Sequence, residues 1–159
     1  MFAQHTPYAP MQQREIKALS EEQIRGYLDG AGMGLALPAE LNGYPGPKHV
    51  LELADPLALK PEQREAVQAI FDRMKKRATD LGTRIVEGEM ALEKAFRSGS
   101  IDAGTLQTQT TALAKLQGEL RLAHLAAHLE TKALLSPAQL KAYARLRGYE
   151  ADASHAHHH

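Results

Sequence analysis

The sequence predicts an all-α fold built on one long antiparallel helical hairpin, with short N-terminal helices and a short C-terminal helix. In the first arm, apolar or small residues recur in alternating steps of four and three between Val67 and Phe96, which keeps one face toward a partner helix. The second arm repeats this pattern between Leu106 and Leu134, and neither arm contains an internal proline. The low aromatic content of 5%, without any Trp, also argues against a β-sandwich.

Both arms begin and end with helix signals. Pro61 suits the first turn of the first arm. Gly99 suits the left-handed residue that follows a helix, and Asp102 can cap the second arm. At 1.5 Å of rise per residue, each arm should be roughly 50 Å long.

Shorter helices are expected on both sides of the hairpin. Ser20 and Gln23 form a capping box that starts a helix ending near Gly30. Further short helices are expected over 35–41, 47–55 and 136–148. The expected organisation is a flexible N-terminal arm over 1–19, a single all-helical domain over 20–148 and a disordered, His-containing tail over 149–159. We interpret the terminal histidines as a purification tag, with a natural metal-scavenging tail as the alternative.

Composition excludes several classes of function. Lys+Arg and Asp+Glu balance at 19 each, so no overall positive charge attracts nucleic acid or an anionic membrane. No apolar run is long enough for a membrane span, and no signal peptide is visible, which leaves a cytoplasmic protein or a mature exported form. There is no cysteine, and no nucleophile or carboxylate pair suggests catalysis. We therefore expect no nucleic-acid partner and no enzymatic activity.

The sharpest chemical feature is a pair of histidines on the second arm. His124 and His128 are four residues apart, so their imidazoles lie on one helix face, close enough to share a metal ion. Helical geometry places His124 at the border of the hairpin seam and His128 on its flank. The alternative is that both are half-buried histidines bonded to carbonyls or to Glu119 and Glu130.

A closed metal site needs ligands from elsewhere in the chain. His49 is the natural candidate because it is the only other histidine outside the two tails. Glu52 lies about one turn on and could ligate or orient His49. Met33, which lies between glycines, could add a soft ligand if the metal were copper. The alternatives are an exposed His49 and a Met33 that only fills the core.

Two short segments that flank the hairpin carry a family resemblance. Residues 59–63 and 135–139 both read Leu-x-Pro-x-Gln. Their order around a long hairpin, with short helices ahead of it, resembles the Spy/CpxP superfamily of periplasmic chaperones and heavy-metal sensors, which repeats an LTxxQ motif. Both copies differ at the second position, where Lys60 and Ser136 replace the usual Thr; Ser can still cap a helix, but Lys cannot.

The resemblance implies export to the periplasm, a curved helical hairpin and a homodimer. It also implies either metal sensing or the holding of unfolded client proteins. Members that sense nickel, cobalt, zinc or copper use core histidines in pairs such as His-x-x-x-His, and the matching residues here are His124 and His128. We favour a periplasmic protein that binds a divalent transition metal, whether copper, zinc, nickel or cobalt.

Two alternatives remain open. An ATP-independent chaperone would hold unfolded proteins under envelope stress, and the residues that could contribute to its surface are Arg64, Phe71, Arg73, Met74, Lys76, Arg77 and Arg84. A helical adaptor would bind a membrane-bound signalling partner. Leu122, Leu125 and Leu129 form a second apolar stripe on the second arm, which the N-terminal helices or a second subunit could cover.

Overall fold

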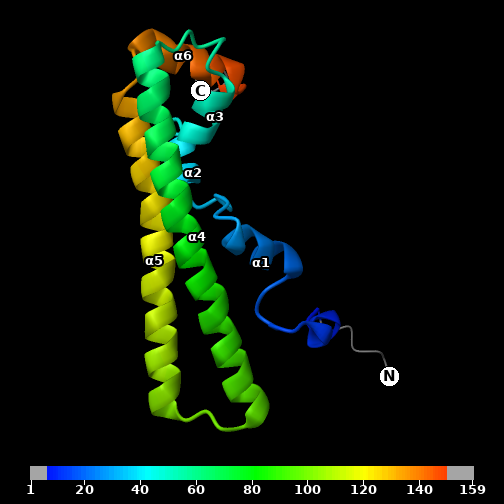
Figure 1. Cartoon of the computed structure of the whole chain (residues 1–159). Coiled ribbons are helices and arrows are strands. Elements are labelled where there is room, and N and C mark those ends of the chain that lie inside the picture. The colour runs from blue at the N-terminus through cyan, green and yellow to red at the C-terminus, as the bar shows by residue number, and fades with distance from the viewer. Residues whose placement is uncertain (1–6, 150–159) are drawn as a thin grey trace, which may run out of the picture.

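The computed structural model describes residues 7–149, and within this range all regular secondary structure is helical (Figure 1). The elements in order are the 3-10 helix η1 (Ala9–Gln13) and the α-helices α1 (Glu21–Leu28), α2 (Leu37–Glu40), α3 (Pro47–Glu52), α4 (Pro61–Ser98), α5 (Ala103–Ala133) and α6 (Pro137–Leu146). The predicted all-α fold, with a long hairpin and shorter helices around it, is confirmed. The short helices α2, α3 and α6 gather at one end of the hairpin, which we call the head (Figure 1).

The hairpin of α4 and α5 follows the predicted helix signals closely. Gly99 ends α4 in the left-handed conformation, with φ of 72°. The Asp102 side chain accepts a hydrogen bond from the Thr105 amide and caps α5, as expected for an N-cap residue. The turn between the arms lies at the end opposite the head, which we call the tip (Figure 1).

The seam between the arms is filled along only part of its length. One buried cluster at the head includes Val50, Val67 and Tyr143, and a second includes Leu81 and Leu120. Toward the tip the two helices diverge (Figure 1). Two residues that the sequence pattern assigns to the seam are exposed there, namely Phe96 at 55% and Leu106 at 36%.

The two Leu-x-Pro-x-Gln segments meet at the head through their glutamines. Nε2 of Gln63 donates to Oε1 of Gln139 at 2.8 Å, and Nε2 of Gln139 donates back to Oε1 of Gln63 at 3.0 Å. Each glutamine also accepts a hydrogen bond from the backbone amide three residues before it, at Lys60 and Ser136. The same side chains therefore start two helices and join them, and we call this arrangement the glutamine clasp.

The N-terminal helix α1 crosses α4 at very short range. A Cβ on Gly82 would lie 1.9 Å from the carbonyl oxygen of Tyr27, a distance that no other residue could accept without displacing the backbone. Ser20 and Gln23 form the predicted capping box at the start of α1. A single glycine of α4 thus sets how closely α1 approaches the hairpin.

The described part of the expected N-terminal arm packs against α4. Ile16 and Leu19 are buried, and the backbone amide and side chain of Lys17 both bond to Glu93. Residues 7–19 therefore differ from the flexible arm expected over 1–19, because two buried apolar side chains and a charged contact hold them. Residues 1–6 lie outside the described range.

Other boundaries differ in detail from the sequence prediction. Helix α2 is shorter than the expected 35–41, and the last helix ends at Leu146 rather than near Gly148. Tyr149, expected to begin the disordered tail, is packed at the head, and the remaining tail over 150–159 lies outside the described residues. None of the helices described over 7–149 is sufficiently long and apolar to cross a membrane.

Candidate metal centre

The histidine pair lies on the part of α5 nearest the head. His124 is buried in the hairpin, with only 3% of its surface exposed, and its Nε2 has no hydrogen-bond partner. Burial of an imidazole nitrogen without a partner costs free energy. An unpartnered donor atom of this kind is what a metal ligand presents before the ion arrives.

The segment between α1 and α2 approaches the His124 side chain. The backbone of Ala31 lies near His124, and Gly30, Met33 and Gly34 all adopt positive φ. Burial lowers the pKa of His124, and the nearby His128 lowers it further, whereas the Ala31 backbone acts in the opposite direction. The ring is therefore biased toward the neutral form, which is the form that binds metals.

His128 is held in one orientation by the turn before α3. Its Nδ1 lies 2.7 Å from the carbonyl oxygen of Tyr44. Because a carbonyl can only accept, Nδ1 carries the proton and Nε2 of the neutral ring keeps its lone pair. A Cβ on Gly46 would lie 2.7 Å from this Nε2, so the absence of a side chain at position 46 leaves space beside the free nitrogen.

A buried carboxylate lies on the other side of His128. Oε1 of Glu40 is 3.7 Å from Nδ1 of His128 and accepts a hydrogen bond from the Gly46 amide. Oε2 accepts hydrogen bonds from the hydroxyls of Tyr143 at 2.6 Å and Tyr149 at 2.8 Å. Burial, followed by the hydrogen bond to Glu40, raises the pKa of Tyr143, so its hydroxyl stays protonated as a donor.

The other predicted ligands lie in different surroundings. His49 and Glu52 bond to each other on α3, with Nδ1 and Oε1 2.9 Å apart, and both are partly or largely exposed. Sδ of Met33 lies against α1, where a Cβ on Gly26 would be 3.1 Å away. Over residues 7–149, no group of three or more His, Asp or Glu side chains is placed to hold a metal ion. A single chain therefore does not bring His49 together with His124 and His128.

A family comparison identifies the kind of protein to which this chain is related. The family model described as heavy-metal resistance matches residues 31–142, which is more than half of the chain. The chain belongs to the heavy-metal resistance family. This family is part of the Spy/CpxP-like helical superfamily, so the resemblance is confirmed. It is a family of resistance or binding proteins rather than of enzymes. Comparison with curated proteins and with solved structures yields no match.

The donors of this member of the heavy-metal resistance family fit a transition metal in their chemistry. Imidazole nitrogens suit zinc, copper and nickel, and the pair offers an unpartnered Nε2 at His124 and a free Nε2 at His128. Two nitrogens are fewer than the four ligands usual around zinc. Water or another molecule must supply the rest.

The basic residues considered for a chaperone surface are largely paired in this family member. Arg73 bonds to Glu130 and Arg77 bonds to Glu119, each with a 3.0 Å contact from α4 to α5. Arg64 contacts Asp55, which lies between α3 and α4, at 3.2 Å. Glu119 and Glu130 therefore bond to arginines and not to the histidines. For His128, the sequence left open a bond to a carbonyl or to one of these glutamates, and the structure shows the carbonyl of Tyr44.

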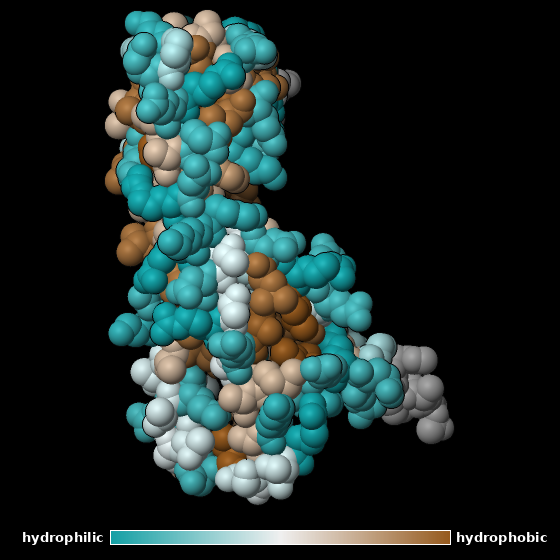
Figure 2. Space-filling view, viewed as in Figure 1, coloured by the Kyte–Doolittle hydropathy of each residue, from teal (hydrophilic) through white to brown (hydrophobic). Residues whose placement is uncertain are grey.

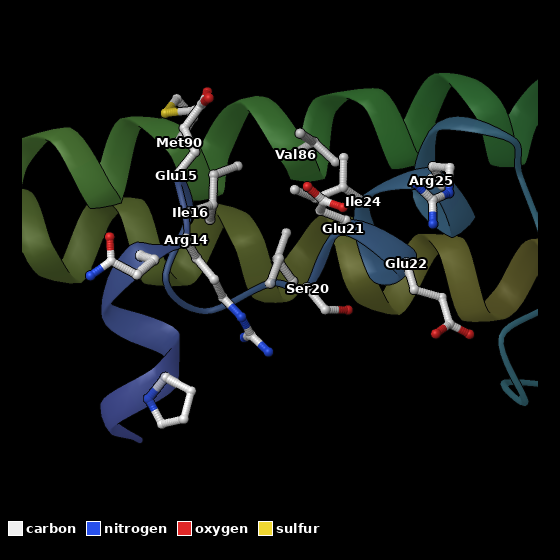
Figure 3. A pocket seen from close by; sticks show the side chains of 13 residues that line it. Arg14, Glu15, Ile16, Ser20, Glu21, Glu22, Ile24, Arg25, Val86 and Met90 are labelled. Atoms are coloured by element: carbon white, nitrogen blue, oxygen red, sulfur yellow. The ribbon is translucent and has the colours of Figure 1, made fainter. Parts of the chain in front are cut away.

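A separate groove, lined by both apolar and charged residues, lies where the N-terminal segment meets α4. Its volume is about 840 Å³, and its apolar lining includes Ile16, Ile24, Val86 and Met90. Figure 2 shows a broad hydrophobic area on this face, and Figure 3 shows Ile16 and Ile24 facing the α4 side chains. Sequence reasoning missed this groove because it treated residues 1–19 as unpacked.

Proposed function

We propose that this protein binds a divalent transition metal ion through His124 and His128, in metal sensing or resistance. The observation that carries the proposal is the buried, unpartnered Nε2 of His124 one helical turn from His128. A metal ion would satisfy the nitrogen that the fold leaves without a partner. Membership of the heavy-metal resistance family supports the same function.

The two histidines would hold the ion through their Nε2 atoms. The Tyr44 carbonyl keeps the proton of His128 on Nδ1, so this ring needs no change of tautomer before binding. Burial favours neutral His124, so this ring needs no loss of its charge. The bound metal would act as a reporter of metal supply or as a sequestered ion, without a chemical step. His49, Glu52 and Met33 would contribute only after a movement of the chain or from a second molecule.

Metal titration of the full chain, with the tail histidines at 155 and 157–159 changed to serine, tests the proposal. Calorimetry with Cu(II), Zn(II), Ni(II) and Co(II) should detect tight binding to this protein. The variant with His124→Ala and His128→Ala should lose it, whereas the His49→Ala control should retain it. Binding should weaken below about pH 6, because protonated imidazole cannot ligate. Unchanged affinity in the double variant would overturn the proposal.

Holding unfolded polypeptides is a second candidate function, and the groove between the N-terminal segment and α4 favours it. The groove combines half-buried apolar side chains with charged residues at its rim, including Arg14, Glu22 and Arg25, a mixture that suits extended chains of varied sequence. Excess protein should slow the aggregation of a chemically denatured client. Val86→Glu should abolish this effect, with Glu87→Gln on the neighbouring exposed surface as the control. No suppression by the parent protein would exclude the function.

We also propose export to the periplasm and a homodimer, both on the basis of superfamily membership. The dimer is supported by Leu122 and Leu129 on α5, which are 64% and 62% exposed and would gain cover from a second copy. Light scattering should give twice the chain mass, and Leu122→Lys should lower it. A monomeric parent protein would remove the dimer.

A further inference from the structure

We propose that Glu40 is a positioning residue for His128, acting on the nitrogen that binds the metal without touching the ion. This inference rests on the proposed function. Glu40 lies on α2, and no sequence pattern marks it as part of the site. Its carboxylate would be an outer partner of a metal-bound imidazole, which influences the metal ligand without binding the metal itself. The cation it serves would be the divalent transition metal held by the histidine pair.

The geometry puts the carboxylate on the side of the ring opposite the ligating nitrogen. Oε1 of Glu40 is 3.7 Å from Nδ1 of His128, while the proton on Nδ1 is donated to the Tyr44 carbonyl. The side chains of His128 and Glu40 are only 13% and 10% exposed, so solvent screens the charge weakly. A negative charge here favours the proton on Nδ1 and makes Nε2 a stronger donor.

The position of the Glu40 carboxylate is set by groups that do not contact the histidine ring. Oε2 is occupied by the hydroxyls of Tyr143 and Tyr149, and Nε of Arg147 lies 3.7 Å away. Oε1 accepts from the Gly46 amide. Residues of α6 and of the segment that follows it therefore hold the carboxylate so that Oε1 remains beside His128.

Gly46 contributes to the same arrangement from the opposite side. Its amide donates to Glu40, and its missing side chain leaves room at Nε2 of His128, where a Cβ would be 2.7 Å away. One residue thus links the carboxylate to the open side of the ring. The arrangement is similar to a carboxylate–histidine–metal triad, except that the Nδ1 proton is donated to the Tyr44 carbonyl and the carboxylate acts through its charge. Loss of an outer partner of a metal-bound histidine weakens metal affinity by about 10-fold to 100-fold.

The test compares Glu40→Gln with Tyr143→Phe in the full chain with the tail histidines replaced. Glu40→Gln removes the charge but keeps the shape, whereas Tyr143→Phe removes one hydrogen bond from the same cluster and leaves the charge with Tyr149 still donating. In Zn(II) calorimetry, Glu40→Gln should bind about 10-fold to 100-fold more weakly. Tyr143→Phe should lose clearly less affinity, because the negative charge remains and Tyr149 still donates to it. Equal losses in both variants would mean a purely structural role and overturn the proposal.

A spectroscopic measurement on the metal-free protein separates positioning from general loss of structure. In ¹⁵N NMR spectra, His128 should be the Nδ1–H tautomer in the parent and in both variants, because the Tyr44 carbonyl accepts this proton in each. The ¹⁵N shift of Nε2 should change clearly more in Glu40→Gln than in Tyr143→Phe, because only the first variant removes the charge. A parent His128 with its proton on Nε2, or an unchanged Nε2 shift in Glu40→Gln, would overturn the proposal. If the parent protein fails to bind Zn(II), the proposed function fails instead, and the NMR result still decides the role of Glu40 at the ring.

Discussion

The glutamine clasp makes a quantitative prediction about stability. Gln63 makes four hydrogen bonds: it accepts from the Lys60 amide, donates to the Leu134 carbonyl and exchanges two bonds with Gln139. Each such bond has a net value of about 0.5–1.5 kcal/mol, and the partners left behind are partly buried. Four such bonds give about 2–6 kcal/mol, and because the site is only partly buried, water can replace part of what is lost. Gln63→Leu should therefore lower the free energy of unfolding by about 2–3 kcal/mol, the lower part of this range. For a chain of this length, this corresponds to a fall in Tm of about 4–12 °C.

A double-mutant cycle tests whether the two glutamines act together. Gln139→Leu should cost about as much as Gln63→Leu, but the double variant should lose only about 3–4 kcal/mol, because neither amide is left facing an apolar group. Urea denaturation followed by circular dichroism gives all four free energies. Gln68→Leu on the exposed face of α4 is the matched control, since Gln68 bonds only to Asp72 one turn away. Additive losses, or single losses no larger than that of the control, would refute the clasp.

Three further predictions concern packing and charge. Gly82→Ala should loosen α1, because the new Cβ would meet the Tyr27 carbonyl, and hydrogen exchange of the α1 amides should increase strongly. Because the pKa of His124 is lowered by burial, the unfolded state takes up protons first as the pH falls. The unfolding free energy should therefore fall from pH 7 to pH 5, and His124→Gln should flatten this dependence. An equally steep fall in the variant and the parent would contradict this prediction. Arg73→Ala should cost at most about 1 kcal/mol in thermal denaturation, because its pair with Glu130 is exposed.

Local signals explain why the hairpin could be predicted in detail. Pro61, Gly99 and Asp102 each act on the helix end beside them, and the observed helix ends coincide with these residues. The place of His124 at the border of the hairpin seam followed from its angular position relative to Leu120 on one helix, and the structure shows that both residues are buried. Such features depend on helix geometry alone, so they need no knowledge of the rest of the fold.

Features that join distant segments could not be predicted in the same way. The two glutamines were recognised as capping residues, but nothing in either segment indicates that they bond to each other. Glu40 carries no local signal, because its partners Tyr143 and Tyr149 are more than 100 positions further along the chain. The expected approach of His49 to the histidine pair required the orientation of α3, which the sequence pattern leaves undetermined.

The uneven filling of the hairpin has a mechanical consequence. One buried cluster and the paired amides resist deformation at the head, and a second buried cluster does so further along the hairpin. At the tip, by contrast, Phe96 and Leu106 are exposed and the arms are weakly joined. Bending motions should therefore concentrate near the tip, where the distance between α4 and α5 can change. The part of the hairpin that carries His124 and His128 should stay rigid. A partner that brings the tip ends of α4 and α5 closer together should therefore rotate α5 slightly and leave the surroundings of the two imidazoles unchanged.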